Sequence, residues 1–183
     1  MTNVKLDSCQ RCNNCCTNFG VCLTIFDISR IARETGRNPI SFVDLVDDYS
    51  PRERTEPAII LNHKKYVLVL KHEQKQEKEQ EKRVCTFFKS GGCSIYESRP
   101  YLCRTYPFIL DQTQKGELKD LQNRACVVFW YPKGEAKEKY VTDLKIYFKQ
   151  IEEYKKIVDK WNNDKSNNSK GLSTFLKFAL KEI

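Results

Sequence analysis

Apolar residues recur at helical spacing in the last third of the chain. Between positions 135 and 161 an apolar side chain returns every third or fourth residue, which predicts one long amphipathic helix. The polar run at 166–171 predicts a break, and a second apolar face predicts a last helix over 173–183. Because exposed apolar stripes of that size are rare in monomers, we expect both helices to pack against the rest of the chain.

Two more helices are predicted closer to the N-terminus. Thr24 and Asp27 have the spacing of a capping box and Gly36 is a typical stop, so a helix is predicted between them. Another helix is predicted to start at Asn38-Pro39, because proline suits the first helical turn and apolar residues follow at helical spacing up to position 49. Neither segment carries a chemical motif, and we expect both to be scaffold.

Two short segments, 66–70 and 84–88, are rich in strand-forming residues and are predicted to pair as a hairpin. Residues 71–83 between them hold five basic and four acidic side chains and no apolar one, which predicts a solvent-exposed tip. The whole pattern predicts an α+β fold in which four to five helices wrap a small cysteine-rich core with a short β-hairpin. It further predicts a cysteine-cluster domain over 1–132 and a C-terminal helical extension over 133–183.

Composition narrows the classes of partner. A length of 183 residues suits one domain or one domain with an appendage. The net charge of +8 is spread over the chain, because 1–132 and 133–183 each hold an excess of four basic side chains, so we do not expect a nucleic-acid partner.

The longest apolar stretch, 125–131, is far shorter than the roughly 20 residues that cross a bilayer, and the first residues lack the apolar segment of a signal peptide. We therefore expect a cytoplasmic protein with no membrane partner.

Nine cysteines, five of them between positions 9 and 22, are the main chemical signal. In a reducing cytoplasm such cysteines are more often metal ligands or redox groups than disulfides. Four of them stand as Cys9-x2-Cys12-x2-Cys15-Cys16, and a two-residue spacing lets a turning backbone point its sulfur atoms at one metal centre. Neighbouring side chains usually diverge, so we expect one centre to accept only one of Cys15 and Cys16. Both histidines lie outside this run, which predicts a centre made chiefly of thiolates.

Two motifs together resemble a known family. The run CxxCxxCC stands at 9–16, and C-x-I-Y-x-x-R-P-x-x-C-R-x-Y-P-F stands at 93–108. With them, over roughly residues 9–130, the chain resembles the YkgJ-like cysteine-cluster family of zinc- or iron-chelating domains, which is related to the cysteine-cluster domain of flagellin N-methylase. The resemblance implies eight metal-binding cysteines: Cys9, Cys12, Cys15, Cys16, Cys85, Cys93, Cys103 and Cys126.

Two cysteines depart from the pattern of that family. Cys126 is followed by Val127-Val128, where the family often has Pro-Gly. Cys22 has no counterpart and stands where an apolar residue is usual, so we expect it to be a core thiol.

Eight cysteines suit two tetrathiolate centres, or one cluster with a reactive or disulfide-capable pair. We expect one or two 4Fe-4S clusters, because adjacent thiolates and nearby tyrosines fit a shielded cluster, and zinc is the alternative. Arg99 and Arg104 flank Pro100 and Cys103, so we expect them at the cofactor. Each would either contact the negative charge of a cluster or pair with a carboxylate such as Asp27.

The sequence thus favours an iron–sulfur protein that transfers electrons or assists an enzyme, with a protein redox partner or an enzyme as its partner. One alternative is an enzyme related to lysine N-methylation, although its glycines form no Gly-rich cofactor loop. Another is an interaction module stabilised by zinc. No Ser/His/Asp or Cys/His arrangement is visible, so we do not expect catalysis by side chains alone.

Overall fold

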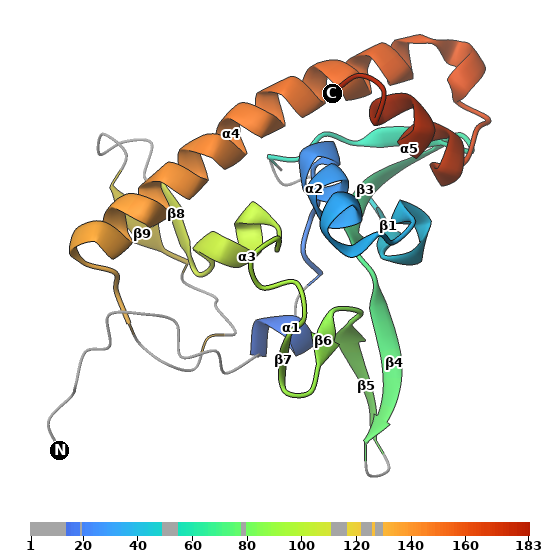
Figure 1. Ribbon diagram of the computed structural model, residues 1–183. Helices are drawn as coiled ribbons and strands as arrows, with labels where there is room; N and C mark the ends of the chain where they lie inside the picture. The colour runs from blue at the N-terminus through green and yellow to red at the C-terminus, as the bar shows by residue number, and fades with distance from the viewer. Residues whose placement is uncertain are drawn as a thin grey trace, which may run out of the picture.

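The computed structural model describes residues 14–18, 20–48, 55–77, 80–110, 117–121, 126 and 130–183. Within these ranges the chain forms an α+β fold of five α-helices and several small antiparallel sheets, as the sequence predicts (Figure 1). The helices are α1 (Asn14–Asn18), α2 (Ile25–Thr35), α3 (Tyr101–Thr105), α4 (Gly134–Asn163) and α5 (Leu172–Ala179), with 3-10 turns at Pro39–Ser41 and Lys165–Asn167.

The strands form four separate sheets. Three of them make one sheet in the order β1 (Val43–Asp47), β3 (Lys64–Leu70), β2 (Ile59–Leu61). The others form two-stranded ribbons: β4 (His72–Glu77) with β5 (Gln80–Cys85), β6 (Phe88–Lys89) with β7 (Gly92–Cys93), and β8 (Phe108–Leu110) with β9 (Leu118–Asp120).

Helix α2 begins and ends where its local sequence predicts. The Thr24 hydroxyl accepts a hydrogen bond from the Asp27 amide while the Asp27 carboxylate accepts one from the Thr24 amide, which completes the capping box. Gly36 follows the helix with φ of 66°, a left-handed conformation that costs glycine little. The predicted helix is confirmed.

The helix predicted from Asn38 is wrong. The segment makes only the 3-10 turn Pro39–Ser41 and then enters β1, which pairs with β3 in the register Val43↔Leu70. A short apolar run fits helical and extended spacing equally well, and here pairing with a distant strand decides the outcome.

The predicted pairing of 66–70 with 84–88 is also wrong, whereas the predicted exposure of the charged segment is confirmed at Lys71, Glu73, Gln74 and Arg83. Strand β3 pairs with β1 and β2, while the charged segment itself forms the ribbon β4–β5, in which His72 pairs with Cys85. In a two-stranded ribbon the backbone groups between the strands pair with each other and the outer groups bond to water, so most of the ribbon forms without apolar side chains. Figure 1 shows the ribbon extending away from the body, and its base sets the position of Cys85.

The predicted C-terminal helices are confirmed as α4 and α5. Tyr154 and Trp161 of α4 and Phe175 of α5 are buried in the main hydrophobic core together with α2 and the three-stranded sheet. Leu144 of α4 contributes to a second core with Phe108, Leu118 and Trp130. Figure 1 shows α4 running along one side of the whole molecule. The predicted division at residue 132 stays a prediction.

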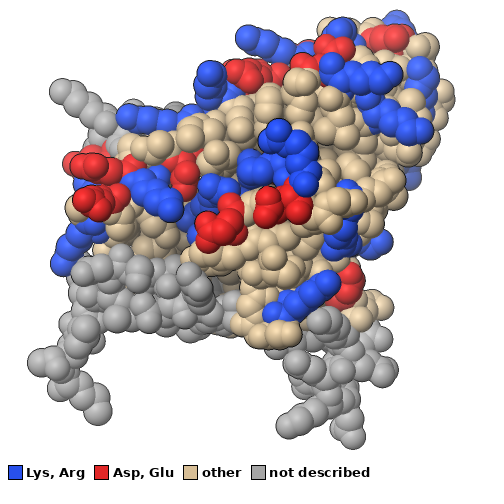
Figure 2. Space-filling model, in the orientation of Figure 1, with Lys and Arg blue, Asp and Glu red and all other residues tan. Residues whose placement is uncertain are grey.

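The surface carries both signs of charge. On the face seen in Figure 2, Lys and Arg side chains are interspersed with Asp and Glu. In the described part of the chain, no helix has the length and apolar character needed to cross a membrane.

Candidate metal centre

Five cysteines from four elements come together at one cavity. Cys15 and Cys16 lie on α1, which packs against β5, and Cys85 is the last residue of β5. Cys93 ends β7, which Gly91, with φ of 76°, turns back onto β6. Cys103 lies on the short helix α3.

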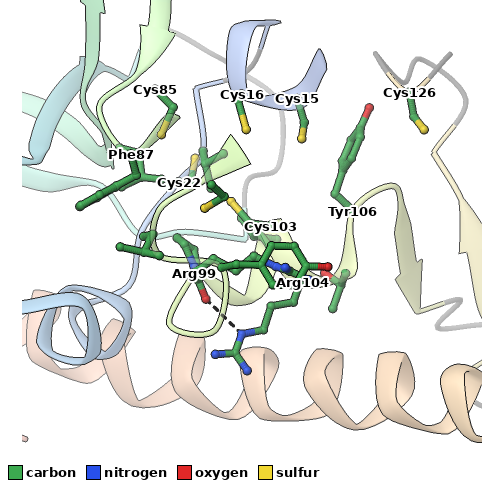
Figure 3. A pocket seen from close by; sticks show the side chains of 18 of the residues that line it. Cys15, Cys16, Cys22, Cys85, Phe87, Arg99, Cys103, Arg104, Tyr106 and Cys126 are labelled. Atoms are coloured by element: carbon green, nitrogen blue, oxygen red, sulfur yellow. Dashed lines mark hydrogen bonds between the residues drawn. The ribbon is translucent and has the colours of Figure 1, made fainter. Parts of the chain in front are cut away.

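The cavity has a volume of about 560 Å³ and is lined by all five of these cysteines. Figure 3 shows the side chains of Cys15 and Cys16 directed from α1 towards the space that Cys85 and Cys103 also face. The two adjacent cysteines therefore line the same cavity, whereas the sequence led us to expect that one centre would accept only one of them. A one-turn helix allows this, because it presents both side chains on the side that faces β5 and α3.

The five thiols act on one another electrostatically. Burial raises the pKa of Cys85 to about 11, raises that of Cys93, and raises that of Cys103 well above the usual thiol value. The Cys16 thiol donates a hydrogen bond to Cys15, which lowers the pKa of Cys15 to about 7 and raises that of Cys16. Without a bound cation most of these groups are therefore neutral thiols, and binding a metal would release their protons.

Arg99 brings a positive charge to the thiols. Its guanidinium lies 3.6 Å from the ring centroid of Tyr96. Its charge helps to lower the pKa of Cys15, and at Cys93 it partly offsets the rise in pKa that burial causes. Its Nε and Nη1 atoms are buried and have no hydrogen-bond partner among the described residues. Of the two roles expected from the sequence, this position favours contact with the negative charge of thiolates.

Asp27, the carboxylate expected to pair with Arg99 or Arg104, forms an ion pair with Arg30. Asp27, with 1% of its surface exposed, pairs at 2.5 Å with Arg30 of the same helix and not with either predicted arginine. Arg30 also donates to the carbonyls of Ser98 and Arg99, and Asp27 accepts from the amide of Tyr101. The pair thus joins α2 to the start of α3 and to the loop that carries Arg99. The sequence patterns gave no sign of Arg30.

Arg104 donates hydrogen bonds to backbone carbonyls. It donates to the carbonyl of Arg99 at 3.1 Å and to that of Glu97 at 2.5 Å, and its guanidinium lies over the ring of Tyr101. These contacts hold the loop before α3 in place. A role for Arg104 at a cofactor stays a prediction, although the residue lines the cavity.

The remaining cysteines occupy different places. Cys22, expected in the core, is half-buried beside Val69 of β3 and lines the same cavity as the five thiols. Cys126 also lines the cavity, but Figure 3 shows it apart from the others, on the far side of Tyr106. Cys9 and Cys12 lie outside the described residues.

The donor set fits a soft, thiophilic metal or a metal–sulfur cluster, because thiolates are the ligands these centres prefer. Within the described part of the chain, no three Cys, His, Asp or Glu side chains lie close enough together to hold one ion. The sulfur atoms instead surround the cavity.

Comparison with known proteins agrees with this chemistry. Neither the curated proteins nor the solved structures gave a match. A sequence model of the CxxCxxCC family, described as a "putative zinc- or iron-chelating domain", matches residues 8–127. That match covers more than half of the chain, and the protein therefore belongs to the CxxCxxCC family.

Proposed function

We propose that the protein binds a 4Fe-4S cluster through the thiolates around this cavity and serves in electron transfer or as an accessory to a partner enzyme. The observation that carries the proposal is the convergence of Cys15, Cys16, Cys85, Cys93 and Cys103 on one cavity that the guanidinium of Arg99 also lines. When bound, such a cluster supplies reversible one-electron chemistry.

The arrangement of the thiols supports a cluster over a single ion. Within the described residues, no three Cys, His, Asp or Glu side chains lie close enough together to hold one ion, although five thiols line one cavity. Zinc held by four thiolates needs all four sulfur atoms about 2.3 Å from one point. A cluster is bulkier and binds each thiolate through a different iron atom, which suits sulfur atoms that surround a space.

The charge of Arg99 supports an anionic occupant. Four thiolates around a 4Fe-4S core leave a net negative charge, and burying that charge costs free energy unless a cation lies nearby. Arg99 lines the cavity and its positive charge lowers the pKa of Cys15, so the same charge would stabilise a negatively charged centre bound by the thiols.

The surroundings of the thiols suit a redox centre. Phe87, Ile95 and Leu70 line the cavity and are at most 5% exposed, so they limit the access of water to the centre. Limited solvation and nearby hydrogen-bond donors are the means by which proteins tune the potential of a cluster.

The experiment that tests the proposal is anaerobic purification followed by counts of iron, sulfide and zinc per chain, with visible and EPR spectra. We expect about four iron and four sulfide per chain, absorption near 400 nm and an EPR signal after reduction. One zinc per chain without colour would overturn the cluster and leave a zinc-stabilised module. About eight iron would add a second centre.

Two serine variants show which thiols hold the iron. Cys103→Ser should lose most of the iron, because Cys103 is half-buried and lines the cavity together with the other thiols. Cys126→Ser, the matched control, should retain it, because Tyr106 separates Cys126 from the others. Equal loss of iron from both variants would place Cys126 among the ligands and contradict a centre confined to the five thiols.

A further inference from the structure

Two arginines hold the backbone of the loop that carries Arg99. Arg30 of α2 donates to the carbonyl of Ser98 at 3.2 Å and to that of Arg99 at 3.1 Å. Arg104 of α3 donates to the carbonyl of Glu97 and, at 3.1 Å, to that of Arg99, a bond drawn as the dashed line in Figure 3. The carbonyl of Arg99 thus accepts a hydrogen bond from each of the two guanidinium groups. Hydrogen bonds from charged donors are stronger than those between neutral groups, so this carbonyl is firmly held.

The same two arginines share one aromatic ring. The guanidinium of Arg30 lies 4.7 Å from the ring centroid of Tyr101, and that of Arg104 lies 4.9 Å from the same centroid. Contacts between a guanidinium and a ring are attractive at these distances. Asp27 pairs with Arg30 and accepts the amide of Tyr101, so it holds both groups from the side of α2. Arg30, Tyr101 and Arg104 therefore form one connected unit, which we call the arginine clamp.

The side chain of Arg99 lies at the other end of this chain of contacts. It lines the cavity, and its guanidinium lies 3.6 Å from the ring centroid of Tyr96, which lines the cavity as well. Its charge reaches the thiols, because it helps to lower the pKa of Cys15. The interaction between two charges weakens with distance, so a displaced Arg99 would stabilise a negatively charged centre less well.

The guanidinium groups of the clamp are arranged to act on Arg99 and not on the centre itself. Arg30 is not among the residues that line the cavity. Arg104 does line it, but its Nε and Nη2 atoms donate to the carbonyls of Arg99 and Glu97. Both residues therefore have their contacts on the loop, and Arg99 is the member of the group whose charge is directed at the thiols.

We propose that Arg30 and Arg104 are positioning residues of the metal centre, which hold the carbonyl of Arg99 so that its guanidinium stays beside the thiols. The proposal rests on the metal centre proposed above, but not on the identity of the metal. Thiolates around zinc and thiolates around a 4Fe-4S core both leave an excess of negative charge, which Arg99 would stabilise in the same way.

The rate at which excess EDTA removes the bound metal measures this stabilisation in the full-length protein as purified, whichever metal it holds. Arg99→Gln removes the charge and should make metal loss about 10-fold faster, the lower end of the effect of residues that support metal ligands. Arg104→Lys keeps a positive charge but loses the planar fork of donors, so it should make metal loss about 3-fold faster. Arg30→Lys should act in the same direction.

The double variant tests whether Arg104 acts through Arg99. In the Arg99→Gln background, Arg104→Lys should change the rate by less than about 1.5-fold, because the charge that it positions is already absent. An equal effect in both backgrounds would overturn the proposal, since Arg104 would then act by another route, such as the position of Cys103. A wild-type rate in Arg99→Gln or in Arg104→Lys would overturn it as well. Arg33→Lys, the same change at an exposed position of α2, is the control and should leave the rate unchanged.

Tyr96→Leu tests the other end of Arg99, and its result does not depend on whether Arg104→Lys folds. It removes the ring beneath the guanidinium and changes no charge, so it should make metal loss about 3-fold faster in the wild-type background and leave the rate unchanged in Arg99→Gln. Equal effects in both backgrounds would contradict the positioning of Arg99. Iron, sulfide and zinc are counted in the same samples, so a protein loaded with zinc would overturn the cluster and still give a result for the clamp.

Discussion

A hydrogen bond between the thiols of Cys15 and Cys16 affects the two residues in opposite ways. The thiol of Cys16 is the donor, so Cys16 holds its proton more tightly and Cys15 loses its proton more easily. Cys15 therefore has a pKa of about 7 among thiols whose pKa values are raised. In the metal-free protein it is the natural first ligand for an incoming cation and the most reactive of these thiols towards alkylating agents.

This hydrogen bond can be tested by removing its donor. In metal-free protein, Cys16→Ala should raise the pKa of Cys15 from about 7 towards the ordinary thiol value of about 8.5 and slow its alkylation at pH 7 by about tenfold. Cys16→Ser keeps a donor at the same position and should keep the pKa of Cys15 near 7. The pH profile of iodoacetamide labelling, read at Cys15 by tandem mass spectrometry, measures both. Equal profiles in the two variants would contradict the assigned cause.

At the level of elements, local signals predict local structure well. The capping box at Thr24, the glycine stop at Gly36 and the apolar period of α4 each act within a few turns of chain, and both helices, α2 and α4, form as predicted. The prediction of a helix from Asn38 was wrong because strand β1 depends on a distant partner, with Val43 paired to Leu70. The charged segment instead pairs with itself in a local ribbon that no alternation of apolar residues indicates. Local sequence carries little information on such pairings.

The candidate site, too, could be predicted from the sequence only in its local features. The spacing of the cysteines and the position of Arg99 beside Cys103 could be read from the sequence. Their shared cavity could not, because α1, β5, β7 and α3 meet only in the folded chain. The same applies to Cys22, which lines the cavity, and to the Asp27–Arg30 pair that links α2 to α3.

The Asp27–Arg30 pair should therefore contribute to the stability of the site as well as of α2. Asp27→Asn leaves the charge of Arg30 without its partner beside the carbonyls of Ser98 and Arg99. Breaking such a pair costs about 3–5 kcal/mol when it is fully buried, and we expect about 2–4 kcal/mol here because Arg30 is 20% exposed. Urea unfolding measures the change.

Thr24→Ser is a suitable control for that variant, because it keeps the hydroxyl cap and should change stability by less than about 1 kcal/mol. We also expect Asp27→Asn to bind less metal, since Asp27 holds the amide of Tyr101 at the start of the helix that carries Cys103. Wild-type stability with full metal content in Asp27→Asn would contradict this role.

At the level of the whole molecule, α4 links the two hydrophobic cores on which the cavity walls depend. Its first half packs against the core of Phe108 and Trp130, and its second half against the core of α2 and the three-stranded sheet. It also packs against α3, which carries Cys103. The cavity thus depends on a helix outside the region that matches the family.

A buried tyrosine of α4 makes the main core sensitive to alkali. Burial raises the pKa of Tyr154, whereas in the unfolded chain a tyrosine ionises near pH 10. Because the folded state holds the proton of the Tyr154 hydroxyl more tightly than the unfolded state does, the stability that this group contributes is fully present below pH 10 and is lost as the pH rises further. Unfolding free energy should fall by about 1.4 kcal/mol per pH unit above 10 for this group.

Tyr154→Phe isolates the effect. The hydroxyl of Tyr154 is buried and has no hydrogen-bond partner among the described residues, so the variant should be as stable as the wild type at pH 7, within about 1 kcal/mol. Above pH 10 it should lose less stability than the wild type. Urea titrations at pH 7, 9, 10.5 and 11.5 provide the comparison, and parallel curves for the two proteins would contradict the assignment.

The shared cores also predict what happens when the C-terminal helices are removed. Residues 1–132 alone would expose the surfaces that Tyr154, Trp161 and Phe175 cover, all of which are at most 1% exposed in the full chain. At about 25 cal/mol per Å², burial of three aromatic side chains contributes a free energy comparable with the usual stability of about 5–15 kcal/mol for a domain, so we expect 1–132 to lack a cooperative thermal transition and to retain little metal. Circular dichroism and metal analysis measure both, with the full chain purified in parallel. A cooperative transition with full metal content in 1–132 would instead establish the division at residue 132 as a true domain boundary, with α4 and α5 an appendage that the metal centre does not need.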